Sequence, residues 1–84
     1  MRLRGDCKVV SFRGHHLLTT GYKSLEINQS FAEILKIALK GAFTVESLAS
    51  ELIQMFDLEA PEATLEASTI IDTLKNHDLL DGND

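Results

Sequence analysis

Ser24-Leu25-Glu26-Ile27-Asn28 opens the stretch of sequence that decides the fold, and Leu79-Leu80 closes it. Leu25 and Ile27 alternate with polar residues, which predicts a short strand with one apolar face. Apolar residues then recur at the spacing of amphipathic helices in three segments, 29–39, 45–56 and 62–77. A strand followed by three helices is typical of a small winged helix-turn-helix domain when a hairpin precedes it.

That hairpin is expected in the first 20 residues. Lys8–Phe12 predicts a strand, Arg13-Gly14 a tight turn and His15–Thr20 the returning strand. The predicted fold class is α+β, a winged helix-turn-helix-like domain with three N-terminal β-strands followed by three α-helices. The 84 residues are expected to form a single domain, 1–84, with an ordered core at about 8–80. Residues 81–84 are expected to fray.

Three residues indicate where the helices begin. Asn28 and Thr44 fit N-cap positions, because their side-chain oxygens can accept hydrogen bonds from backbone N–H groups of the first turn. Pro61 fits the first turn of the third helix, where its missing N–H is no loss.

The composition narrows the class of protein. Apolar residues make up 44% of the chain, as in folded globular proteins. No apolar run reaches the roughly 20 residues of a membrane helix, and the charged start is not followed by the apolar core of a signal peptide. The single Cys7 cannot form an internal disulfide, which suits a reducing compartment. We therefore expect a cytoplasmic protein with no membrane partner.

Charge is divided unevenly along the chain. Residues 1–23 carry five bases and one acid, whereas residues 24–84 carry three bases and twelve acids. Binding to nucleic-acid phosphates requires clustered Lys and Arg, but from Asp57 onward there are eight acids and one base, Lys75. The sequence therefore predicts a protein or peptide partner and no nucleic acid, with a winged-helix DNA-binding protein as the alternative.

Other chemistries have less support. His15, His16 and His77 with Cys7 could form a metal set, but adjacent strand residues such as His15 and His16 point to opposite faces, so no metal site is expected. No phosphate-binding loop or nucleophile motif occurs, which predicts a protein that is not an enzyme and needs no cofactor. Glu46-Ser47-Leu48 is similar to the triplet that bears phosphopantetheine in carrier proteins, so a carrier is a further, less favoured alternative.

Three segments in order resemble the PqqD family, named for the small protein of pyrroloquinoline quinone biosynthesis. Residues 27–35, Ile-Asn-Gln-Ser-Phe-Ala-Glu-Ile-Leu, are similar to the family's Leu-Asn-x-x-Ala-x-x-Ile. Residues 41–52, Gly-Ala-Phe-Thr-Val-Glu-Ser-Leu-Ala-Ser-Glu-Leu, are similar to its Gly-x-x-Thr-Val-Glu-Glu-Leu-Ala-x-x-Leu. Residues 70–80 are similar to its closing Leu-x-x-Leu-x-x-x-Gly-Leu-Leu, with Asp78 in place of the usual glycine. The likeness spans about residues 8–80.

The resemblance implies a non-catalytic peptide-binding module, a recognition element of ribosomal-peptide modification systems. Such a peptide chaperone captures the leader of a ribosomally made precursor peptide and presents it to a separate modifying enzyme, often a radical SAM maturase. The leader would add as a strand beside residues 24–27, in the groove next to the third helix. Strand addition gives affinity through main-chain hydrogen bonds and specificity through side-chain pockets.

The expected peptide-binding residues lie on that edge and on the third helix. On the edge they are Lys23, Leu25, Glu26 and Ile27. One flank of the helix offers Ile70, Thr73 and His77, the other offers Ser68 and Ile71, and the sequence does not choose between the flanks. Core packing is the commoner role for each apolar residue taken singly. Replacing Ile27 with Pro is expected to remove a ladder donor and abolish binding.

Overall fold

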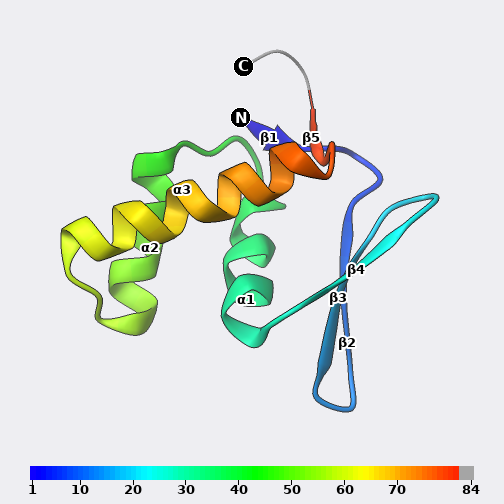
Figure 1. The fold of residues 1–84 in the computed structure, drawn as a ribbon, viewed down its shortest axis with the longest axis horizontal. Coiled ribbons are helices and arrows are strands. Elements are labelled where there is room, and N and C mark those ends of the chain that lie inside the picture. The colour runs from blue at the N-terminus through cyan, green and yellow to red at the C-terminus, as the bar shows by residue number, and fades with distance from the viewer. Residues whose placement is uncertain (82–84) are drawn as a thin grey trace.

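The computed structural model describes residues 1–81 and has the predicted α+β architecture (Figure 1). Its elements are β1 (Arg2–Leu3), β2 (Lys8–Phe12), β3 (His15–Thr19), β4 (Ser24–Ile27), α1 (Gln29–Ala38), α2 (Val45–Phe56), α3 (Ala60–Asn76) and β5 (Leu80–Asp81). The three predicted strands and three predicted helices are all present, and α3 begins at Ala60, before its expected start.

A three-stranded antiparallel sheet forms one side of the molecule, in the order β2-β3-β4. The turn between β2 and β3 places Arg13 at φ 52° and Gly14 at φ 81°. Two successive residues with positive φ are the geometry of the type I′ turn, whose twist suits a two-residue hairpin. Because β3 lies in the middle, β2 and β4 are the two edges of this sheet.

Two short strands join the ends of the described chain, and the sequence did not predict them. β1 pairs antiparallel with β5, with Arg2 opposite Asp81 and Leu3 opposite Leu80. On its other side, Met1 exchanges backbone hydrogen bonds of 2.6 and 3.0 Å with Phe43, in the loop between α1 and α2. The expectation of a tail that frays from residue 81 is therefore wrong at Asp81, and residues 82–84 lie outside the described part of the chain.

The predicted N-caps of the first two helices, Asn28 and Thr44, are confirmed by their hydrogen bonds. The Asn28 side chain accepts from the Phe31 N–H at 2.7 Å. Thr44 and Ser47 form a reciprocal capping box, in which each side-chain oxygen accepts from the other residue's N–H, at 3.0 and 2.8 Å. Pro61 lies in the first turn of α3.

The core lies where one face of the sheet meets the helices. α1 packs against β2 and β3, and α3 packs mainly along α2 and ends beside β1 and β5 (Figure 1). The largest fully buried side chains are Leu18, Ile34, Leu35, Leu48, Leu74 and Leu79. They come from β3, from all three helices and from the turn after α3, so burial of apolar surface holds the sheet and helices together. Within residues 1–81, no helix is long and apolar enough to cross a membrane.

Candidate functional site

β4 has one unpaired side, because it is the last strand of its sheet. The two-residue turn makes Phe12 and His15 a hydrogen-bonded pair. From this pair onward, hydrogen-bonded and non-hydrogen-bonded pairs alternate along the antiparallel ladder. By this alternation Ile27 directs its N–H and C=O toward β3, whereas Glu26 and Ser24 direct theirs to the open side. Ser24 and Glu26 are therefore the residues whose backbone can pair with an added strand.

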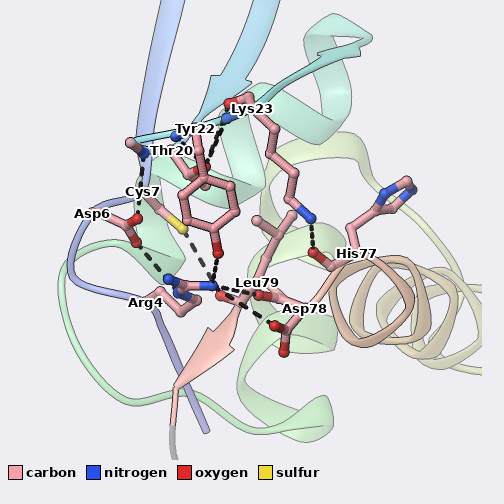
Figure 2. Close-up of polar contacts among 10 residues, drawn as sticks. Arg4, Asp6, Cys7, Thr20, Tyr22, Lys23, His77, Asp78 and Leu79 are labelled. Carbon is pink, nitrogen blue, oxygen red and sulfur yellow. Dashed lines mark hydrogen bonds and ion pairs between the residues drawn. The ribbon is translucent and has the colours of Figure 1, made fainter.

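The start of β4 is fastened to the end of α3, as Figure 2 shows. The Thr20 N–H donates to the Lys23 C=O at 2.8 Å, which closes the turn before β4 and fits the same alternation. Lys23 Nζ then donates to the backbone carbonyl of His77, the C-cap of α3. The helix dipole favours a cation at this end of a helix. Two of the expected site residues, Lys23 and His77, are thus brought together.

Arg4 extends this fastening to the N-terminal segment (Figure 2). Its Nη1 donates to the Tyr22 hydroxyl and lies 3.3 Å from the Asp78 carbonyl oxygen, and its Nε lies 3.4 Å from Asp6 Oδ1. The guanidinium also stacks over the Tyr22 ring, 5.2 Å from its centroid. The hydrogen bond to Tyr22 raises the pKa of Arg4, so this contact favours its charged form.

The side chains of β4 point to two different surroundings. Leu25 and Ile27 are half-buried and pack against the core. Glu26 projects from the opposite face, where its carboxylate lies 3.2 Å from His15 Nδ1. Among the three, therefore, only Glu26 has an exposed side chain.

The two flanks of α3 differ in what they adjoin. Ile70, Thr73 and His77 follow one helical stripe that continues backward to Glu66 and Glu62, since these residues are spaced three or four apart. Ile70 is only 5% exposed, yet it lines a pocket shared with Asn28, the residue directly after β4.

On the opposite flank, Ile71 is 3% exposed and packs in the core, and Ser68 is half-buried. Neither lines the pocket with Asn28. The hydroxyl of Thr73, on the first flank, is occupied within the helix, because it donates to the Thr69 carbonyl at 2.9 Å.

The pocket has a volume of about 350 Å³ and lies between the start of α1, the end of α2 and the first half of α3. Its apolar lining comes from all three helices and the loop between α2 and α3: Phe31, Leu52, Phe56, Leu58 and Ile70. Polar residues at its boundary are Asn28, Ser30, Glu62 and Glu66. Except for Ile70, these residues were not predicted to be part of a site. A pocket built from four segments has no sequence signature. The acidic residues at the start of α3, Glu62 and Glu66, are the part of it that the sequence pattern makes visible.

The histidines are not gathered into a metal centre in the described structure. His15 contacts Glu26 on one face of the sheet, whereas His16 Nδ1 lies 2.8 Å from Ser11 Oγ on the other face. No group of three His, Cys, Asp or Glu residues within residues 1–81 is placed to hold a metal ion. Cys7 is buried, and burial raises the pKa of its thiol.

Comparison with known proteins gives a likeness of fold. No protein-family model matches the sequence, and no curated protein matches it either. Among solved structures, TbiB1 in complex with the TbiA(beta) leader peptide superposes with a TM-score of 0.80 at 13% identity, covering 100% of this chain and 99% of that one. Lasso peptide synthetase B1 complexed with the leader peptide superposes with a TM-score of 0.72 at 21% identity, covering 93% of each chain. At these identities the likeness shows the shared fold.

Proposed function

We propose that this protein is a non-catalytic, PqqD-like recognition element that binds the leader of a ribosomally made precursor peptide by strand addition to β4. The observation that carries the proposal is the open edge of β4, which is fastened to α3 at one end and adjoins an apolar pocket at the other. An unpaired strand edge beside side-chain pockets is the arrangement that strand-adding peptides use. The two solved structures of this fold, both complexed with leader peptides, support the same assignment.

In this proposal the backbones of Ser24 and Glu26 pair with the leader. The flank of α3 with Ile70, Thr73 and His77 forms the facing wall, and Leu25 and Ile27 pack between β4 and the core. Ile71 and Ser68 belong to the other flank of α3, behind this wall. Lys23 holds the edge against α3. The single domain needs no cofactor, works in the cytoplasm where precursor peptides are made, and presents the leader to a separate modifying enzyme such as a radical SAM maturase.

Two alternative functions are less well supported by the same residues. A DNA-reading α3 would place the exposed carboxylates of Glu62, Glu66 and Asp72 near phosphates, which repel them. A phosphopantetheine carrier would need the Ser47 hydroxyl free, but this oxygen accepts from the Thr44 N–H at 2.8 Å and donates to the Thr44 carbonyl at 3.1 Å.

The test begins with the natural ligand. The tagged protein is used to capture partners from its source lysate, short peptides are included in the mass spectrometry, and the recovered leader is synthesised with a fluorophore. Fluorescence anisotropy then gives its Kd. Recovery of nucleic acid or of acyl-transfer enzymes in place of a precursor peptide would overturn the proposal.

The decisive variant is Glu26→Pro, which removes the outward N–H of β4 without removing a bond to β3. Proline is tolerated on an edge strand when its missing N–H faces solvent. We expect the leader to bind about tenfold more weakly or worse, because one hydrogen bond of about 1 kcal/mol is lost and the ring obstructs the added strand. The sequence-based choice, Ile27→Pro, is a poorer test because the Ile27 N–H faces β3.

Two controls make the result specific. Glu26→Ala removes the same side chain and keeps the N–H, so it should bind like the parent protein. Ser11→Pro makes the matched change on β2, at the other edge of the sheet, and should also leave binding intact. Circular dichroism checks that each variant folds. Unchanged binding by folded Glu26→Pro protein would rule out strand addition at β4.

A further inference from the structure

The pocket at the end of β4 indicates which kind of leader side chain binds beside it. This inference rests on the proposed function. It is continuous with the proposed peptide groove, because Asn28 directly follows β4 and Ile70 belongs to both the pocket and the facing flank of α3. A peptide paired along β4 would reach this pocket as it passes Asn28. The pocket's chemistry therefore selects one part of that peptide.

The floor of the pocket is apolar. Leu52 and Ile70 are almost fully buried at its base, and Phe31 and Leu58 are half-buried around it. Phe56 remains 38% exposed, so part of its ring is accessible to a bound group. A volume of about 350 Å³ is at the small end of ligand pockets, so a single long side chain with its neighbouring backbone would fill it.

The rim of the pocket is acidic. Glu62 and Glu66 stand four apart on α3, so their side chains are neighbours on the same face and their like charges repel. Residues 57–74 contain no Lys or Arg to offset them. Within residues 1–81, both carboxylates are exposed and neither has a hydrogen-bond or ion-pair partner. The repulsion would be relieved by a cation from outside the chain.

We propose that this pocket holds an Arg or Lys side chain of the bound leader, with its aliphatic stem on Phe31, Phe56 and Ile70 and its cationic head between the carboxylates of Glu62 and Glu66. Arg and Lys combine an apolar stem with a charged end, which matches an apolar floor below a charged rim. The protein would therefore select leaders with a basic residue at this position of the strand.

The first test is a double-mutant cycle with the recovered leader. Each Arg and Lys of the leader is replaced in turn by Met, which keeps a long apolar stem and removes the charge. Binding is then measured to the parent protein and to Glu62→Gln/Glu66→Gln. Met at one leader position should weaken binding to the parent protein by about two- to fivefold for each carboxylate that the basic side chain contacts. The same replacement should have no effect on binding to Glu62→Gln/Glu66→Gln, as expected for two directly coupled sites. The coupling should also weaken as salt is raised.

Asp72→Asn is the matched control. It removes an exposed carboxylate from α3 outside the pocket, so it should leave the loss at the basic position unchanged. A leader that contains no Arg or Lys, or one that binds Glu62→Gln/Glu66→Gln as tightly as the parent at low salt, would overturn the cation pocket. If leader binding is still weakened by Glu26→Pro in that case, strand addition at β4 stands without the cation pocket.

The second test needs no leader. Two-dimensional NMR of the ¹⁵N-labelled protein is recorded with N-acetyl-arginine amide and, for comparison, with uncharged N-acetyl-norleucine amide. The arginine probe should shift the amide signals of Phe31, Phe56, Glu66 and Ile70 more than the norleucine probe, and the difference should disappear in Glu62→Gln/Glu66→Gln. Such shifts without any leader binding would support the cation pocket and overturn strand addition, whereas equal shifts from both probes would overturn the cation pocket.

Discussion

Asp78 holds a backbone conformation that usually belongs to glycine. Its φ is 58°, in the left-handed region, directly after the C-cap of α3. The Leu79 N–H donates to the Leu74 carbonyl at 2.9 Å and the Asp78 N–H to the Lys75 carbonyl at 3.1 Å, the two bonds of a Schellman motif. The motif turns the chain so that Leu79 returns to the core, 2% exposed. Glycine, the residue of the PqqD motif at this position, would adopt this φ without strain.

Replacing Asp78 with Gly should stabilise the protein, because glycine adopts positive φ without the steric cost of a Cβ. We expect a gain of about 0.5 kcal/mol in the free energy of unfolding, after allowing for the greater freedom of glycine in the unfolded chain. Asp78→Ala is the control and should destabilise, since alanine keeps the Cβ and loses the polar side chain. Urea denaturation measures both, and equal stability of the two variants would contradict the backbone explanation.

Cys7 gives a second prediction at the level of a residue, a pH dependence of stability. Burial, and next the negative charge of Asp6, raise the pKa of its thiol above the ordinary value. As pH rises, the unfolded chain therefore loses this proton before the folded protein does, so deprotonation favours unfolding. The free energy of unfolding should fall as the pH rises through the ordinary pKa of a cysteine thiol, about 8.5. Cys7→Ala should show a smaller fall over the same range, and identical slopes would exclude the thiol as the cause.

At the scale of elements, the start of α2 offers a clean test of capping. Thr44→Ala removes one side of the capping box and leaves the Ser47 N–H without its partner. A lost N-cap costs about 1 kcal/mol, which corresponds to a fall of about 4–8 °C in the Tm of a domain of this size. Thermal unfolding by circular dichroism measures it. Thr44→Ser keeps the acceptor oxygen and should retain most of the stability, and a loss as large as that of Thr44→Ala would argue against the cap.

The longer elements could be predicted from the sequence because each carries its own repeating pattern. Val45–Phe56 shows apolar residues at helical spacing behind a capping threonine, and the structure reproduces both ends of that helix. β1 and β5 are two residues each, too short to show a period, and they pair residues from opposite ends of the chain. The pocket escaped prediction for a similar reason, because Phe31 and Phe56 meet only after three helices have packed. Local pattern thus predicted the edge strand of the candidate site, and tertiary packing supplied the pocket.

At the scale of the whole molecule, the proposed groove depends on how the sheet and α3 are held relative to each other. Arg4 joins three distant parts of the chain: its own N-terminal segment, Tyr22 in the turn before β4, and Asp78 after α3 (Figure 2). Lys23 adds a parallel link to His77. Both links lie at the same end of β4, so they fix the separation between β4 and α3 there.

Arg4→Ala should therefore loosen the site without unfolding the protein. The core residues around it remain buried, but the turn before β4 and the turn after α3 lose their shared partner. We expect faster hydrogen exchange at the amides of Gly21 and Asp78, unchanged exchange in the middle of α2, and weaker leader binding. Arg4→Lys should restore these properties only in part, because an ammonium lacks the planar fork that reaches Tyr22 through Nη1 and Asp6 through Nε together. If Arg4→Ala exchanges and binds like the parent, the position of α3 beside β4 is set by the core alone, and the links at Arg4 play no part in forming the groove.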